Sequence, residues 1–439
     1  MKNIWTRIAC ALIVCVMMIS VASCAAPADT DLYVTEDQLS DINFELLASS
    51  STVNLEGLDP LVADALAINN GIELKFDENG EFKIIFFSDI QDGTGSGSMS
   101  AETLSWMSYF IDTQKPDLVL MPGDVFAGHM TNLKAFKTYI SKLQGPMAKY
   151  NVPWGQVYGN HEEGGHQFDC GIYKEDETGI YMDSPLNVSK NGNVPGNANY
   201  VLPVLRNDGS GKIGYNIFCL DSQDYVYKYG DTATSAEKMA EKDTSSLWAN
   251  NGYDYNDYSF EAEAVPGKVY NGNKYEPINF EQIKWYWDTS VALQEYNGQE
   301  NPITAMMMFH IPLYEMNYIL NNPTESGFEG IQYDPISAAE LSAGLFWALY
   351  ERGDVNLLVH GHDHINGFTG QYMGITMAYC ATIGDYQYHD ATVNGAKQDC
   401  RGVRVVTIKQ GANVGDPCTF TTEMIYVKDI NGGKVPSGY

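Results

Sequence analysis

The sequence predicts an α/β protein in which two β-sheets pack together and helices cover them. Apolar strand segments alternate with amphipathic helix segments between residues 80 and 364, a pattern typical of a largely parallel sheet. After residue 370 the chain changes to successive strand segments. Because a sheet must bury its apolar face, we expect these later strands to form a second sheet that packs on the first.

The first part of the α/β pattern contains three strands and two helices. Each strand has a continuous apolar run that favours burial, and the strands are predicted at 81–89, 117–124 and 152–162. One helix is predicted within 100–117, with Ser100 as its N-cap and its end before Pro116. A second is predicted at 131–144, and a short helix is expected earlier, around 58–69.

The second part continues the alternation. Helices are predicted at 279–296 and 337–354, and strands at 302–312 and 355–364. Residues 165–275, rich in Tyr, Gly, Asn and Asp, form a predicted insertion that contains two strand segments, 199–205 and 212–221. The late antiparallel strands are predicted at 372–384, 401–409 and 419–428.

The N-terminus resembles an export signal. Lys2 and Arg7 precede an apolar run that ends near Ile19 and is too short to span a bilayer. The sequence Val-Ala-Ser-Cys ending at Cys24 resembles a bacterial lipoprotein box. We therefore expect residues 1–23 to be a signal peptide, Cys24 to carry the lipid, and the protein to be anchored in the cell envelope or at the cell surface. Ordinary cleavage nearby, which would release a secreted or periplasmic protein, is the alternative.

Beyond Cys24, residues 24–75 are expected to form a tether and N-terminal extension, and 76–430 the main domain. Five further cysteines lack the CxxC spacing of a thiolate zinc site. Export permits disulfides, and Cys380 with Cys400 is a candidate pair. The odd count leaves at least one thiol unpaired within a monomer.

The charge balance limits the partners. The chain has 26 Lys and Arg against 56 Asp and Glu, a formal net charge of −30. This charge argues against binding to a nucleic-acid backbone or to an anionic membrane surface. Contact with a membrane is expected only through the lipid on Cys24. An anionic substrate would need a metal to attract it.

Polar side chains follow five of the predicted strands. Open α/β sheets bind ligands at the carboxyl ends of their strands, and the candidate ligands there are Asp89, Gln91, Asp124, Asn160, His310, His362 and His364. In an extended segment residues i and i+2 point to the same side, so His362 and His364 can address one site. Nitrogen and oxygen donors without thiolate suit Mn, Fe, Zn or a related divalent ion. Seven candidates exceed the needs of one ion and suit two ions that share a carboxylate.

In this order and spacing, the motifs Asp-x-Gln, Gly-Asp, Gly-Asn-His-Glu, His and Gly-His-x-His resemble those of the calcineurin-like metallophosphoesterases. The resemblance covers roughly residues 82–427 and extends to proteins similar to purple acid phosphatases. It implies a four-layer αββα sandwich of two mixed sheets, with two metal ions. The matching positions are Asp89, Gln91, Asp124 and His364 for one ion, and Asp124, Asn160, His310 and His362 for the other.

The resemblance also implies a chemistry. A metal-bound hydroxide would attack a phosphate ester, and His161 would protonate the leaving oxygen or stabilise charge on the phosphoryl group. His129 and His166 are candidates for the rim of the substrate site. His360, outside the motif, is expected to pack or to support a ligand, and His389 is expected on a surface loop.

Two departures from the family pattern bear on metals and subfamily. Gln91 stands where the first motif usually has His, and its harder oxygen donor favours Mn or Mg over Zn. Ala127 stands where purple acid phosphatases have the Tyr ligand that gives their colour, so this protein should not be purple. Ala127 and Gly128 also replace the Asp-Arg pair of the protein serine/threonine phosphatases.

We expect an exported, metal-dependent phosphoesterase, with a phosphorylated small molecule or other phosphoester as substrate. A phosphomonoesterase is the first expectation, and a phosphodiesterase or nucleotide pyrophosphatase of the same fold is the alternative. A third possibility, from a different class, is a non-catalytic surface lipoprotein that binds glycans through its Tyr-rich loops.

Overall fold

The computed structural model describes most of the chain from residue 55 onward. The described ranges are 55–92, 97–126, 133–163, 181–192, 194–223, 225–226, 274–275, 277–339, 342–386 and 388–439. The expected signal peptide, Cys24, His129, His166 and Cys170 lie outside these ranges. None of the helices in these ranges combines the length and the hydropathy that a membrane span requires.

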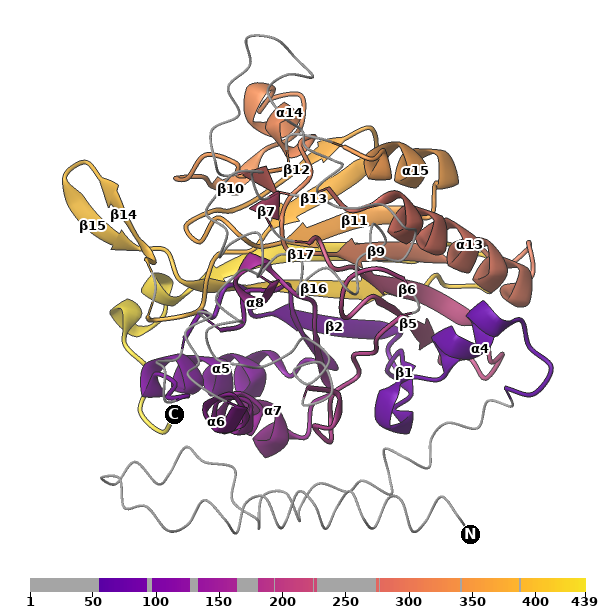
Figure 1. Cartoon of the computed structure of the whole chain (residues 1–439), viewed down its shortest axis with the longest axis horizontal. Coiled ribbons are helices and arrows are strands. Elements are labelled where there is room, and N and C mark those ends of the chain that lie inside the picture. Colours follow the sequence, from indigo (N-terminus) through magenta and orange to yellow (C-terminus); the bar gives the residue numbers. More distant parts are fainter. Residues whose placement is uncertain are drawn as a thin grey trace, which may run out of the picture.

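The smaller of the two main sheets has five strands, in the order β17-β16-β2-β3-β4. The bounds are Glu81–Phe86 (β2), Leu118–Met121 (β3), Trp154–Gln156 (β4), Gly402–Lys409 (β16) and Thr419–Tyr426 (β17). Strands β2, β3 and β4 run parallel, and β16 runs antiparallel to both β2 and β17. Helices α5, α6 and α7 lie on the outer side of this sheet (Figure 1), at Ala101–Gln114, Leu133–Leu143 and Gly145–Tyr150.

The larger sheet has eight strands, in the order β1-β5-β6-β9-β11-β13-β12-β10. Its bounds are Leu74–Lys75 (β1), Tyr200–Leu205 (β5), Ile213–Cys219 (β6), Thr304–Met308 (β9), Glu329–Ile331 (β10), Val355–His360 (β11), Gly367–Tyr372 (β12) and Ile375–Tyr379 (β13). Its outer helices are Pro60–Leu66 (α4), Phe280–Asn297 (α13), Met316–Asn321 (α14) and Leu345–Arg352 (α15).

Several short elements complete the described chain. Two short antiparallel pairs are β7 with β8 and β14 with β15, at Tyr225–Val226, Lys274–Tyr275, Asp390–Val393 and Ala396–Asp399. Helix α8 is a single turn at Asn160–Glu163. Three 3₁₀ turns lie at Asn69–Gly71, Val427–Asp429 and Asn431–Gly433.

Side-chain alternation along β9 explains the layers. Met306 and Met308 belong to the apolar core that also contains residues of the smaller sheet, whereas Ala305 and Met307 belong to the core under α13 and α15. Successive residues of a strand face opposite sides, so the large sheet is covered on both faces at β9. The molecule is a four-layer αββα sandwich of two mixed sheets, which confirms the predicted fold class.

The two sheets are joined beside the carboxyl ends of their parallel strands. Arg404 on β16 is fully buried and donates to the Tyr379 carbonyl at 2.8 Å and the Phe368 carbonyl at 3.2 Å, both in the large sheet. The Thr382 hydroxyl donates to the Asp89 carbonyl at 2.7 Å. These bonds fix the separation of the loops that carry the candidate ligands.

Most of the predicted elements are present, and the Ser100 cap is confirmed, since its hydroxyl accepts from Glu102 N and Thr103 N. The prediction that the three late strands follow one another in one sheet is wrong. β13 lies in the large sheet, parallel to β11, whereas β16 and β17 lie in the small sheet. All five residues of β13 are buried, as in a strand covered on both faces.

Two further expectations are corrected. The helix predicted at 337–354 begins only at Leu345, because Gly344 adopts a left-handed conformation with φ 98°. The proposed pairing of Cys380 with Cys400 is also wrong, since both are free buried thiols. Cys380 follows β13 in the large sheet, whereas Cys400 precedes β16, and the Cys400 thiol donates to the Gln398 carbonyl at 3.3 Å.

Candidate metal centre

The candidate ligands come from loops at the carboxyl ends of five strands. Asp89 and Gln91 follow β2, Asp124 follows β3, Asn160 opens α8 after β4, His310 follows β9, and His362 and His364 follow β11. These strands belong to both sheets. The centre therefore lies where the carboxyl ends of strands from the two sheets come together.

The structure brings five of the seven candidates into two groups of potential metal donors. One group contains Asp124, His310 and His362, and the other contains Asp89, Asp124 and His364. Within each group the donor atoms lie within 4.8 Å of one another. Asp124 belongs to both groups, which is the arrangement expected of a carboxylate shared between two ions.

The distances within the groups are short. His310 Nε2 lies 3.1 Å from Asp124 Oδ2, and His364 Nε2 lies 3.7 Å from Asp89 Oδ1. His310 Nδ1 donates to the Pro122 carbonyl at 2.8 Å, and His364 Nδ1 donates to the Tyr388 carbonyl at 3.1 Å. Such second hydrogen bonds fix the tautomer and leave the Nε2 lone pair for a metal.

Gln91 and Asn160 are both buried, at 2% exposure each. The Gln91 side-chain nitrogen donates to Asp124 Oδ2 at 2.6 Å. A half-turn of this amide would present its oxygen to a cation near Asp124. The ligand roles of Gln91 and Asn160 stay predictions.

The donor chemistry fits a cation. Asp89 and Asp124 are almost fully buried, and burial raises the pKa of Asp89. Burial opposes ionisation of Asp124 as well, but His310 and His161 hold its pKa well below the usual range. His362 Nε2 is buried and has no hydrogen-bond partner among the described residues. Divalent ions would satisfy these carboxylates and this nitrogen together.

The backbone at four candidate ligands is in the left-handed region, which non-glycine residues rarely adopt. The φ angles are 48° at Asp89, 36° at Gln91, 49° at Asp124 and 92° at His362. Each such conformation costs about 1–3 kcal/mol and persists where the surroundings enforce it. Four such residues at one site indicate that the rest of the fold stabilises a strained backbone there, and this backbone sets the direction of the candidate ligand side chains.

Two glycines of the motifs leave room for the carboxylates. A Cβ at Gly159 would lie 2.2 Å from Asp124 Oδ1. A Cβ at Gly361 would lie 2.0 Å from Ser88 Oγ and 2.4 Å from Asp89 Oδ2. Both positions therefore require glycine because of close approach.

We expect Gly361→Ala to weaken metal binding on the Asp89 side by about tenfold or more, because the methyl group displaces the Asp89 carboxylate. Metal titration followed by calorimetry measures this. The double variant Gly361→Ala/Ser88→Ala removes the closest clashing atom and should recover part of the affinity. Unchanged metal affinity in Gly361→Ala would show that metal binding does not depend on the observed position of the Asp89 carboxylate.

Glu162 joins two loops of the centre, a role that the sequence analysis did not assign to it. Its buried carboxylate accepts hydrogen bonds from four backbone N–H groups, those of Asp124 at 2.9 Å, Phe126 at 3.2 Å, Gly159 at 2.7 Å and Val125. It thereby ties the loop of Asp124 to the loop of Asn160. The Glu of Gly-Asn-His-Glu was the available signal.

We expect Glu162→Ala to destabilise the fold by about 3–5 kcal/mol, because it leaves buried N–H groups unsatisfied. Denaturant unfolding measures this loss, and the remaining folded protein should bind metal more weakly. The stability of the isosteric variant Glu162→Gln should fall between those of the wild type and Glu162→Ala, since its amide still offers one acceptor oxygen. Wild-type stability in Glu162→Ala would remove the loop-tying role.

His161 lies beside Asp124 but differs from the other histidines. Its backbone N–H donates to Asp124 Oδ1 at 2.9 Å, while its ring Nε2 lies 3.9 Å from Asp124 Oδ2. The side chain is 29% exposed, whereas those of His310 and His364 are at most 3% exposed. This partial exposure suits a group that meets substrate.

The remaining described histidines lie apart from the centre's donors. His360 stacks on Phe309 and meets the edge of Tyr379, and burial lowers its pKa to about 3. It is a neutral packing residue. His389 lies near Asp390 and Asp399, but Lys397 and Arg401 already pair with these carboxylates.

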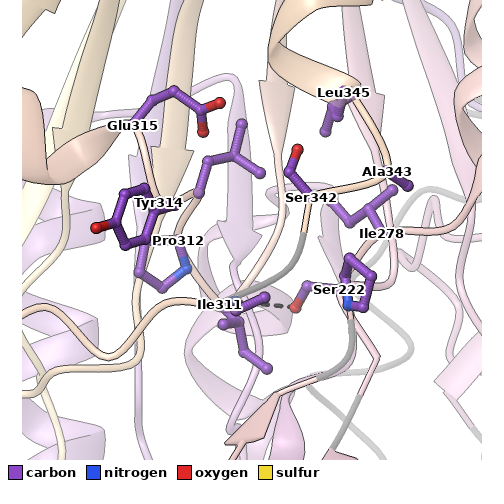
Figure 2. A pocket seen from close by; sticks show the side chains of 12 residues that line it. Ser222, Ile278, Ile311, Pro312, Tyr314, Glu315, Ser342, Ala343 and Leu345 are labelled. Carbon is purple, nitrogen blue, oxygen red and sulfur yellow. Dashed lines mark hydrogen bonds between the residues drawn. The ribbon is translucent and has the colours of Figure 1, made fainter. Parts of the chain in front are cut away.

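A pocket lies beside the segment that follows His310, between the residues that precede α13 and α15. Figure 2 shows its lining, which is mainly apolar, and includes the 2.9 Å hydrogen bond from the Ile311 backbone to Ser222 Oγ. It contains none of the predicted ligands. The bond anchors the chain directly after His310.

Comparison with known families identifies the class. Residues 82–366 match the family described as "Calcineurin-like phosphoesterase". The chain belongs to the calcineurin-like phosphoesterase family, as its motifs predict.

Curated relatives and solved structures add detail. A protein named "Probable inactive purple acid phosphatase 29", from Arabidopsis thaliana, is 26% identical over 337 residues, which cover 73% of this chain and 76% of that protein. "Phosphatase DCR2" from Saccharomyces cerevisiae is 22% identical over 66% of this chain and 45% of that protein. A crystal structure of a dimetal phosphatase from Danio rerio has a TM-score of 0.41 and 13% identity, covering 78% of this chain and 98% of that one. The expected similarity to purple acid phosphatase-like proteins is confirmed.

Proposed function

We propose that this protein is an exported phosphoesterase that uses two divalent metal ions, and that its main activity is that of a phosphomonoesterase. The observation that carries the proposal is the pair of buried donor groups that share Asp124. Membership of the phosphoesterase family supports a phosphate ester as substrate. The basic and apolar N-terminal segment that ends in Val-Ala-Ser-Cys supports export and a lipid on Cys24.

The side chains of the centre have distinct roles in this proposal. One ion would be held by Asp89, Gln91, Asp124 and His364. The other ion would be held by Asp124, Asn160, His310 and His362. Ions bound there would supply Lewis acidity toward a phosphoryl group and water. His161 donates a proton to the leaving oxygen or a hydrogen bond to the phosphoryl group, and Glu162 keeps the Asp124 loop in place.

A substrate panel tests the proposal. The full mature chain, loaded separately with Mn, Mg, Zn or Fe, is assayed with p-nitrophenyl phosphate, bis-p-nitrophenyl phosphate and ADP-ribose. Faster turnover of the monoester supports the proposal. Preference for either of the other two substrates would replace it with a phosphodiesterase or a nucleotide pyrophosphatase.

The name of the Arabidopsis relative contains the word "inactive". The same panel must therefore be able to detect a protein that catalyses no hydrolysis. Metal analysis separates this case. Two bound ions together with no hydrolysis of any ester would contradict the hydrolase and favour a binding protein.

We expect Gln91→His to raise the affinity for Zn relative to Mn, because imidazole is a softer donor than an amide oxygen. Competition between the two ions, followed by metal analysis of the recovered protein, measures the ratio. A shift of at least about fivefold toward Zn is expected. An unchanged ratio would place Gln91 outside the coordination sphere and leave it only the hydrogen bond to Asp124.

A further inference from the structure

An aromatic side chain is fixed against one of the candidate ligands. The Tyr388 ring stacks on the His364 imidazole, with centroids 4.2 Å apart and planes 1° from parallel. The Tyr388 carbonyl accepts from His364 Nδ1 at 3.1 Å. The ring and the backbone of Tyr388 thus each contact the His364 imidazole.

The same ring is open to solvent. Tyr388 is 54% exposed although His364 covers one of its faces. A tyrosine held in this way offers a large apolar surface at low cost in conformational entropy. The accessible surface lies next to His364, one of the candidate ligands, so a ring attached to a phosphoryl group at the centre would have this surface within reach.

Within the described part of the chain, the cationic side chains near the Tyr388 loop already have partners. The basic side chains paired with Asp89 and Asp124 are histidines of the centre: His310 Nε2 lies 3.1 Å from Asp124 Oδ2, and His364 Nε2 lies 3.7 Å from Asp89 Oδ1. The two described arginines nearest in sequence to the Tyr388 loop are already engaged. Arg401 pairs with Asp399, Asp385 and Glu102, and Arg404 binds backbone carbonyls. Aromatic contact is the means of recognition that the described residues offer here.

A second tyrosine flanks the centre at the neighbouring ligand. The ring of Tyr275 meets the His362 imidazole edge to face, with centroids 4.6 Å apart. Tyr275 belongs to β8, far in sequence from Tyr388. Both histidines of the Gly-His-Asp-His segment therefore carry an aromatic neighbour, and of the two tyrosines Tyr388 is the one whose ring lies parallel to its histidine.

We propose that Tyr388 is a substrate-binding platform that stacks on a planar ring in the alcohol part of the phosphate ester. The substrate class is then an aryl or nucleoside phosphate rather than an aliphatic one. This inference rests on the proposed function, because it assumes that the phosphoryl group binds at the metal centre.

Binding of non-hydrolysable phosphonates tests the inference without requiring turnover. The metal-loaded full chain is titrated calorimetrically with phenylphosphonate and methylphosphonate. We expect the wild type to bind the phenyl compound about tenfold more tightly, within the range for aromatic stacking. Tyr388→Ala should reduce this preference to less than about twofold, and Tyr388→Phe should keep it. Tyr350→Ala, which removes a half-exposed tyrosine on α15, is the matched control and should also keep it.

The outcomes are distinguishable. Equal affinity of the wild type for the two phosphonates, or a preference that survives in Tyr388→Ala, overturns the platform. Loss of metal from Tyr388→Ala, with both affinities lowered equally, also overturns it and leaves Tyr388 only the role of supporting His364. A ring preference in a protein that hydrolyses no ester retains the platform and refutes the hydrolase. Phosphonate analogues of AMP and ribose 5-phosphate then distinguish a nucleobase from a simple aryl group.

Discussion

Asp124→Ala is expected to abolish hydrolysis, with a loss of more than about a thousandfold, and to reduce metal content from two ions to one or none. The reason is that the Asp124 carboxylate is the member common to both donor groups. Its Oδ2 lies 3.1 Å from His310 Nε2, and its Oδ1 accepts the His161 N–H. Removal of this side chain therefore affects both groups at once. Metal analysis of the purified variant, together with a steady-state assay, measures the two effects.

A matched control separates this effect from the general cost of losing a buried carboxylate. Asp354 is also buried and accepts hydrogen bonds from the Tyr286 and Ser290 hydroxyls, away from the centre. Asp354→Asn should lower stability and keep both ions. Asp124→Asn, which preserves shape and removes charge, should lose metal nearly as fully as Asp124→Ala. Two ions retained in Asp124→Ala would refute the bridging role.

The sequence predicted the parts of this molecule in which local pattern and burial agree. Buried parallel strands have continuous apolar runs, so β2, β3, β9 and β11 were identifiable, and the polar residues at their ends followed from them. The ligand candidates were predicted because Asp89, Asp124, His310, His362 and His364 occupy equivalent positions after such strands. What the sequence could not supply was the pairing of strands far apart in the chain.

The misplacement of β13 shows why. Its apolar run suits either sheet, and only its pairing with β11, which depends on the packing of the whole molecule, decides between them. The proposed disulfide between Cys380 and Cys400 failed for the same reason. The distance between these two thiols depends on how distant parts of the chain pack, which the sequence does not reveal. The roles of Glu162 and Tyr388 also depend on three-dimensional contacts, namely backbone N–H groups from two loops and a histidine 24 positions earlier. The hydrophobic periodicity of the sequence therefore could not predict the role of Glu162 or that of Tyr388.

His161→Ala is expected to lower kcat by about 10²–10⁴-fold and to leave the metal content unchanged. The substitution removes the ring but keeps the backbone N–H that donates to Asp124 Oδ1 at 2.9 Å. The position of Asp124 should therefore survive, and with it both donor groups. A ring 29% exposed, with Nε2 3.9 Å from Asp124 Oδ2, is placed to meet a substrate rather than to sit inside the ligand set.

The readouts for this variant separate its two possible roles. A proton donor is needed most when the leaving group is poorly acidic, so His161→Ala should lose far more activity on an alkyl phosphate than on p-nitrophenyl phosphate. Equal losses on both esters would indicate that the ring instead stabilises charge on the phosphoryl group. His389→Ala removes another partly exposed histidine and should change neither rate. A fall in metal content that parallels the fall in activity would move His161 into the ligand set and end its assignment as a catalytic residue.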